Sequence, residues 1–129
     1  MKVFVMKHQI RKNFLKKRLK AFSYAGTGLK KAFAREAPFK IHLSVMALVC
    51  LSGFLVGLTI NEWGLIIFCF CLVLSSELFN TCIEKICDFI HPQPGDAMAY
   101  IKDVAAGAVL ICVIAAIIIG SLIFGKHVI

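Results

Sequence analysis

Three familiar signals are missing from this 129-residue sequence, and each absence excludes a class of protein. No GxxxxGK[ST] segment occurs, so the chain has no P-loop with which to bind nucleotide phosphates. None of the six cysteines forms a CxxC pair, so their spacing predicts neither a zinc site nor a disulfide framework. No apolar segment follows the basic N-terminus until after residue 42, so we expect no cleavable secretion signal.

Charged residues are also scarce, at 17% of the chain, whereas 60% of the residues are hydrophobic and the mean hydropathy is +0.85. A water-soluble domain of this size could not bury so much apolar surface, so the chain belongs in a lipid bilayer. All but three of the fifteen basic residues lie between Lys2 and Lys40. Beside membrane spans, such a block is typical of a cytoplasmic segment that binds anionic headgroups, and we prefer this interpretation to a nucleic-acid-binding tail.

Hydrophobic periodicity predicts an all-α membrane protein with an N-terminal amphipathic surface helix and three transmembrane helices. Residues 1–35 carry apolar side chains every three or four positions, which is typical of a helix that lies in the headgroup plane. Residues 36–129 form the membrane domain. We expect its spans at about 42–60, 63–86 and 104–124.

The connections between these spans predict the orientation of the chain in the membrane. Residues 61–64 form a short connection without Lys or Arg, as expected of an outside loop, and Trp63 suits the membrane interface. Proline and glycine in residues 91–96 break the helix on the other side of the membrane. Together with the basic block, this pattern places the N-terminus in the cytoplasm and the C-terminus outside.

The second predicted span carries a stripe of polar residues that share one helix face because they lie three, four and four positions apart. They are Glu77, Asn80, Glu84 and Asp88. Counted from Trp63 at 1.5 Å per residue, Glu77 lies ~21 Å along the helix, within the inner-leaflet hydrocarbon, and Glu84 lies ~32 Å along, at the cytoplasmic boundary. A carboxylate inside an apolar span is costly and indicates a functional site.

The residue types around the inner end of this stripe leave more than one function open. Carboxylates and a lysine are what Mg²⁺ and a polyphosphate need, and the deeper Glu77 could accept a proton from an alcohol at the bilayer surface. That combination would transfer a phosphoryl group to a lipid. The same carboxylate could instead belong to a proton or cation pathway. In the simplest alternative, Glu77 only hydrogen-bonds Ser75, Ser76 or Asn80 of a neighbouring helix.

Two motifs resemble those of the prokaryotic diacylglycerol kinase family, which includes the undecaprenol kinases. They are Glu77-x-x-Asn80-Thr81-x-x-Glu84-x-x-x-Asp88 and Lys102-Asp103-x-Ala105-Ala106-x-Ala108-Val109-Leu110. The resemblance runs from about Tyr24 to the C-terminus. It implies a homotrimer in the bacterial inner membrane, with active sites between subunits, that uses ATP and Mg²⁺ from the cytoplasm to phosphorylate a lipid alcohol.

The resemblance also implies roles for individual positions. Glu77 resembles the general base that acts on the lipid hydroxyl, and Asn80 resembles the residue that orients the stripe. Glu36 and Glu84 resemble the carboxylates that hold Mg²⁺ on the ATP phosphates. The other positions that resemble nucleotide-binding residues are Lys17, Tyr24, Gln93, Pro94, Gly95, Lys102 and Asp103. Among these, residues 93–95 depart from the enterobacterial loop.

The resemblance bears on the acceptor as well. At the position of His42, enterobacterial diacylglycerol kinases have an acidic residue, whereas Gram-positive undecaprenol kinases have histidine. Residues 39–43 and 61–63 also resemble the undecaprenol kinases, although Pro38 departs from both groups. We therefore expect undecaprenol to be the acceptor, with diacylglycerol as the alternative.

Overall fold

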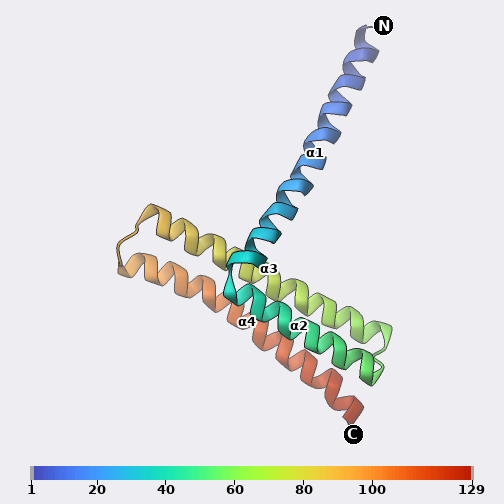
Figure 1. Ribbon diagram of the computed structural model, residues 1–129, viewed down its shortest axis with the longest axis vertical. Helices are drawn as coiled ribbons and strands as arrows, with labels where there is room; N and C mark the ends of the chain where they lie inside the picture. The colour runs from blue at the N-terminus through green and yellow to red at the C-terminus, as the bar shows by residue number, and fades with distance from the viewer. Residues whose placement is uncertain (1, 129) are drawn as a thin grey trace. The chain divides into compact units, whose positions relative to one another are not determined.

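The computed structural model describes residues 2–128 and the side chains of residues 16–127, and Figure 1 shows that the described chain is helical apart from short connections. The helices are α1 (Lys2–Arg35), α2 (Ala37–Val56), α3 (Ile60–Ile90) and α4 (Asp96–Val128). The all-α fold is therefore confirmed. Contacts divide the chain into two compact units, one that ends at Arg35 and one that begins at Glu36.

The first unit is the single helix α1, which has 34 residues. Among its described side chains, Leu19, Phe22, Leu29 and Phe33 recur on one side of the helix, and each is at least half exposed. An exposed apolar face of this kind suits a helix that lies at a membrane interface. The position of α1 at the membrane surface stays a prediction.

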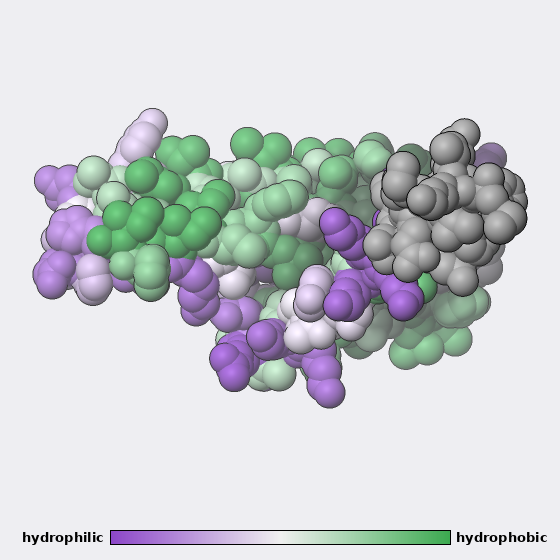
Figure 2. Space-filling view, turned by 90° about the horizontal axis from the view of Figure 1, so that it is seen from above, coloured by the Kyte–Doolittle hydropathy of each residue, from purple (hydrophilic) through white to green (hydrophobic). Residues whose placement is uncertain are grey.

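The second unit contains three helices that are long and apolar enough to cross a membrane, as predicted. The 20 residues of α2 extend ~30 Å, which matches a hydrocarbon core. The 31 residues of α3 and the 33 residues of α4 extend ~46 and ~50 Å, so both helices continue beyond such a core. Figure 2 shows broad apolar areas on the molecular surface, which lipid can cover.

A short turn joins α2 to α3. Gly57 ends α2 in the left-handed conformation, at φ +80°, which favours glycine. Thr59 then caps α3, and its hydroxyl and backbone N–H pair reciprocally with Glu62. The connection predicted at residues 61–64 is therefore wrong, because this capping box starts the helix before Asn61.

We name the end of the second unit near this turn the outer end and the end near residues 91–95 the inner end, after the predicted orientation. The outer end is closely packed. α3 packs against both α2 and α4, and a core cluster forms there around Leu58, Ile66 and Ile123. A Cβ atom at Gly53 would lie only 2.8 Å from Leu58 Cδ1 and 3.0 Å from the Trp63 ring. The close approach of α2 to the start of α3 therefore leaves little room for a side chain at position 53.

Ionic contacts tie the end of α4 to the start of α3. Lys126 Nζ donates to Glu62 Oε1 at 3.0 Å, and His127 Nε2 lies 3.3 Å from the same oxygen. The buried Glu62 thus completes the capping box of α3 and also holds the end of α4. This end of the bundle is fixed independently of the polar stripe, whose first member lies fifteen residues further along α3 at Glu77.

Candidate active site

One face of α3 is buried from its first turn almost to its end. The buried residues recur every three or four positions, or seven at the inner end, and are Glu62, Ile66, Cys69, Val73, Glu77, Asn80 and Cys87. Glu77 is only 4% exposed and Asn80 only 8%. The carboxylate of the predicted base is therefore turned into the helix packing and away from bulk lipid.

Glu77 faces a histidine of the neighbouring helix. His42 on α2 places its Nε2 atom 3.9 Å from Glu77 Oε2, which is within ion-pair range but too long for a hydrogen bond. Glu36 and Glu84 are the other charged groups that interact electrostatically with Glu77. Three of the predicted site carboxylates thus gather around the inner part of α3, together with His42.

Asn80 links two turns of the stripe. Its Nδ2 atom donates to Glu84 Oε1 at 3.0 Å, which orients the half-buried Glu84 carboxylate. Among the described side chains, its Oδ1 atom is buried without a hydrogen-bond partner. Buried polar atoms are normally paired, so this oxygen is a candidate acceptor for a ligand group.

Glu36 stands at the N-cap of α2, but its side chain makes no capping hydrogen bond. Instead, Lys85 Nζ lies 3.5 Å from Glu36 Oε1. Pro38 occupies the first turn of α2, where the fixed backbone of proline is favourable. The Glu36 carboxylate therefore faces α3 at Lys85, the residue that follows Glu84.

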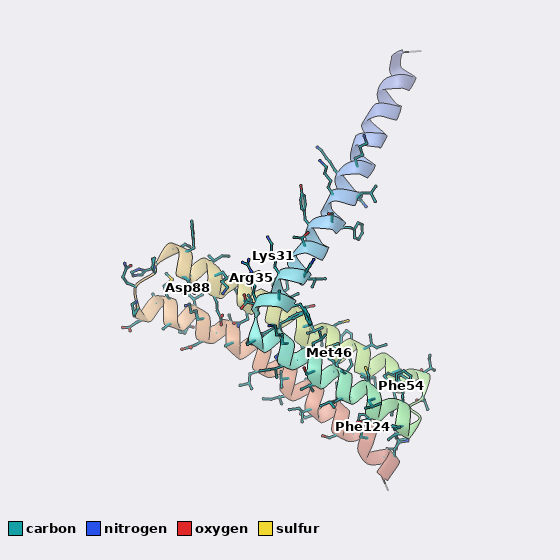
Figure 3. All side chains as sticks on the ribbon, in the orientation of Figure 1. Lys31, Arg35, Met46, Phe54, Asp88 and Phe124 are labelled. Atoms are coloured by element: carbon teal, nitrogen blue, oxygen red, sulfur yellow. The ribbon has the colours of Figure 1, made fainter. Side chains whose placement is uncertain are left out.

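The stripe emerges into a polar environment at Asp88, which is 60% exposed and pairs with Lys102 of α4. Asp103 beside it is exposed and takes no part in that ion pair. In the second unit, Asp88 lies toward the loop end, whereas Phe54 and Phe124 lie toward the other end (Figure 3). The Asp88–Lys102 ion pair and these two aromatic residues therefore lie at opposite ends of the bundle.

The remaining predicted residues lie in the loop and in α1. Gln93 and Pro94 are exposed, Gly95 is half-buried, and Gln93 Oε1 lies 3.2 Å from His91 Nδ1. Lys17 and Tyr24 are exposed on α1, which forms the other unit. Their proposed contacts with a nucleotide stay predictions.

Contacts between helices that were not anticipated from the sequence include His42 with Glu77 and Lys85 with Glu36. Spacing along one helix carries no signal for such pairs. The contact of Asp88 with Lys102 fits the expectation that the polar residues at this end of the spans meet. The short loop between α3 and α4 brings these two residues together.

The fold and the site describe an apolar helical bundle with a buried carboxylate and a polar end, and comparison with known proteins identifies its class. Residues 23–124 match the family model described as prokaryotic diacylglycerol kinase. The chain belongs to this family. It is a lipid kinase of the membrane, and a kinase takes its phosphoryl group from ATP. Of the functions left open by the residues, phosphoryl transfer is therefore the correct one.

The names of similar proteins give two different lipid acceptors, undecaprenol and diacylglycerol. The chain is 37% identical over 113 residues to an undecaprenol kinase of Bacillus subtilis, covering 88% of this chain and 92% of that protein. It is 38% identical over 104 residues to a diacylglycerol kinase of Synechocystis, covering 80% of this chain and 59% of that protein. It is 34% identical over 114 residues to a diacylglycerol kinase of Helicobacter pylori, covering 87% and 84%.

Proposed function

We propose that this protein phosphorylates undecaprenol to undecaprenyl phosphate, with Glu77 as the general base. The observation that carries the proposal is the position of the Glu77 carboxylate, buried in a membrane span with His42 at 3.9 Å and interacting with Glu36 and Glu84. Histidine at position 42 and the match to an undecaprenol kinase over 92% of its length both favour this acceptor.

The chemistry follows from what these residues can do. Glu77 accepts the proton of the lipid hydroxyl, and the lipid oxygen forms a bond to the γ-phosphorus of ATP. The bond from that phosphorus to the β–γ bridging oxygen breaks, and ADP leaves with the electron pair. Because the protein has no covalent step to perform, its contribution is positioning and charge neutralisation.

Glu36 and Glu84 are the residues that would hold Mg²⁺ on the ATP phosphates, where the ion would neutralise phosphate charge. Carboxylate oxygens are ligands that Mg²⁺ prefers, and Asn80 already orients Glu84. Among residues 16–127, no group of three or more His, Cys, Asp or Glu side chains is placed to hold a metal ion. The two carboxylates of Glu36 and Glu84 would suffice for Mg²⁺, which usually takes only one or two carboxylates and completes its shell with phosphates and water.

The nucleotide would bind where the stripe meets the inner loop. Lys102 is held there by Asp88 and can supply a positive charge to the phosphates. The other contacts that we propose come from α1, the loop and the start of α4, at Lys17, Tyr24, Gln93, Pro94, Gly95 and Asp103. We further propose a homotrimer with shared active sites in the bacterial inner membrane, with its N-terminus in the cytoplasm.

Diacylglycerol is the second candidate acceptor, because relatives of 38% and 34% identity carry that name. The deciding experiment supplies purified protein with ATP, Mg²⁺ and either undecaprenol or diacylglycerol in mixed micelles, and measures phosphorylated lipid. We expect faster turnover of undecaprenol. Turnover of diacylglycerol alone would contradict the proposed acceptor, while leaving the kinase assignment intact.

A further inference from the structure

A cavity of about 400 Å³ lies between α2, α3 and α4 of the second unit. Its lining comes from all three helices and is mostly apolar, and its polar side chains include His42 and Ser121. Cavities of this size and character are typical of sites for apolar ligands. Gly120 lines it from α4, and a Cβ atom at that position would meet no atom within 4 Å. The cavity therefore has open space next to Gly120.

One end of the cavity adjoins the proposed base. His42 lines the cavity and also lies 3.9 Å from Glu77 Oε2. Val73 lines it as well, and Val73 precedes Glu77 by one turn on the same buried face of α3. From this end, the lining continues along α4 to Phe124, toward the outer end of the bundle. A lipid whose hydroxyl lies at Glu77 would thus extend its tail in the direction that the cavity follows.

The length of the cavity limits how much of a tail it can hold. Along α4 its lining runs from Val113 to Phe124, which corresponds to ~16 Å at 1.5 Å per residue. An extended chain advances ~1.2 Å per backbone bond, so an isoprene unit of four such bonds spans ~5 Å. The cavity therefore accommodates about three isoprene units. The rest of an undecaprenyl chain would lie in the surrounding lipid.

From these observations we infer that the cavity binds the hydroxyl-proximal isoprene units of the lipid acceptor, so that the enzyme recognises the start of the prenyl chain and not its full length. The inference rests on the proposed function, because it places the acceptor hydroxyl at Glu77. It identifies Gly120 and Ser121 as residues that shape the tail site. Its occupant is one hydrocarbon chain continuous with the reacting alcohol.

The test uses the full-length protein in detergent micelles and a short prenol, farnesol, which has about as many isoprene units as the cavity holds. Binding of radiolabelled farnesol is measured directly, and farnesol and undecaprenol are compared as acceptors. Gly120→Leu fills the open space, whereas Gly125→Leu is the matched control on the same helix. A Cβ atom at position 125 would also meet no atom within 4 Å, and Gly125 does not line the cavity.

We expect Gly120→Leu to weaken farnesol binding by about tenfold or more, while Gly125→Leu binds farnesol as the unsubstituted protein does. If Gly120→Leu does not fold, Gly120→Ala takes its place and should weaken binding to a smaller extent. We also expect farnesol and undecaprenol to be phosphorylated with similar kcat/KM.

Two results would overturn the inference. One is farnesol binding that neither position 120 variant weakens. The other is a kcat/KM for undecaprenol about tenfold or more above that for farnesol, because the enzyme would then recognise more of the chain than the cavity holds. If undecaprenol were still phosphorylated in either case, the proposed function would stand. Conversely, binding that depends on Gly120 without phosphorylation of any prenol would refute the proposed function and keep the tail site.

Discussion

A carboxylate in the apolar part of a membrane span is costly, so its surroundings reveal why it is there. Glu77 is 4% exposed, and the groups around it are one histidine and two further carboxylates. Within residues 16–127, no lysine or arginine is among the groups with the largest electrostatic influence on it. A site that served only to stabilise the fold would pair this charge with a cation. The clustering of acidic groups fits a site completed by a cationic ligand.

The first prediction concerns His42, which lies between the proposed base and the proposed tail site. A carboxylate at this position would stand about as close to Glu77 as the imidazole does and would repel it. We expect His42→Glu to lower undecaprenol turnover by about tenfold or more and to raise the ratio of diacylglycerol to undecaprenol turnover. Parallel assays with both acceptors measure that ratio.

A general loss of packing would lower both activities together and leave their ratio unchanged. The neutral variant His42→Gln serves as the control, since it keeps a polar side chain without adding a negative charge. An unchanged ratio in His42→Glu would contradict a role for this residue in the choice of acceptor.

The second prediction concerns the proposed metal ligands. Glu36→Ala and Glu84→Ala should each weaken binding of Mg²⁺ with a non-hydrolysable ATP analogue by about tenfold or more, because Mg²⁺ has few protein ligands to lose. Isothermal titration of the purified variants measures the affinity directly. Unchanged affinity in both variants would contradict the metal role.

A substitution of Lys85 provides a control in which the affinity for Mg²⁺ should change in the opposite direction. Its ammonium lies 3.5 Å from Glu36 and is 64% exposed at the side chain, so it competes with a metal ion for that carboxylate and can move away. Lys85→Met should therefore strengthen Mg²⁺ binding. Weaker binding in this variant would show that the lysine itself contacts the nucleotide phosphates.

At the scale of single residues, the sequence predicted the polar stripe within one helix and the meeting of polar residues at the ends of the spans, but not the pairs that His42 and Lys85 form. The spacing of Glu77, Asn80 and Glu84 is a property of helical geometry, and the structure places Asn80 and Glu84 in hydrogen-bond contact one turn apart. The contacts of His42 and Lys85 depend on how α2 packs against α3. Helix packing has no short-range signature in the sequence, so these contacts had to come from the structure.

At the scale of the helices, hydropathy predicted that three spans exist but not where each ends. α3 begins at Ile60 because the capping box of Thr59 and Glu62 starts it, and it continues to Ile90, beyond the ~30 Å needed to cross the hydrocarbon. A hydropathy pattern detects apolar residues, so it does not detect the part of a helix that continues beyond the membrane into water. The polar end of α3 and the start of α4 therefore form a helical hairpin that reaches past the membrane core.

The third prediction tests the packing that fixes the outer end of this hairpin. A methyl group at Gly53 would contact Leu58 at 2.8 Å, so Gly53→Ala should destabilise the fold by about 1–3 kcal/mol through overpacking. Gly64→Ala is the matched control, because a Cβ there meets no atom within 4 Å and alanine favours the helix. Thermal unfolding in micelles compares the two variants. Equal stability would contradict the close approach of α2 to α3.

At the largest scale, the second unit has the Asp88–Lys102 ion pair near its loop, an apolar middle that is largely exposed, and an opposite end held by the capping box and the ion pairs of Glu62. Large side chains such as Phe54, Leu55 and Phe79 are more than two-thirds exposed, and both lipid and neighbouring subunits can cover them. The fourth prediction is that native mass spectrometry from mild detergent finds three copies of the chain. A monomer that remained fully active would contradict active sites shared between subunits.

The central claim is that Glu77 removes the proton of a lipid alcohol within the membrane. The most direct test compares transfer of radiolabelled γ-phosphate from ATP to undecaprenol by the unsubstituted protein and by Glu77→Gln, which keeps the shape of the side chain. The account predicts a loss of turnover of about 10²-fold or more, with ATP binding and oligomeric state unchanged. Turnover by Glu77→Gln close to that of the unsubstituted protein would contradict it.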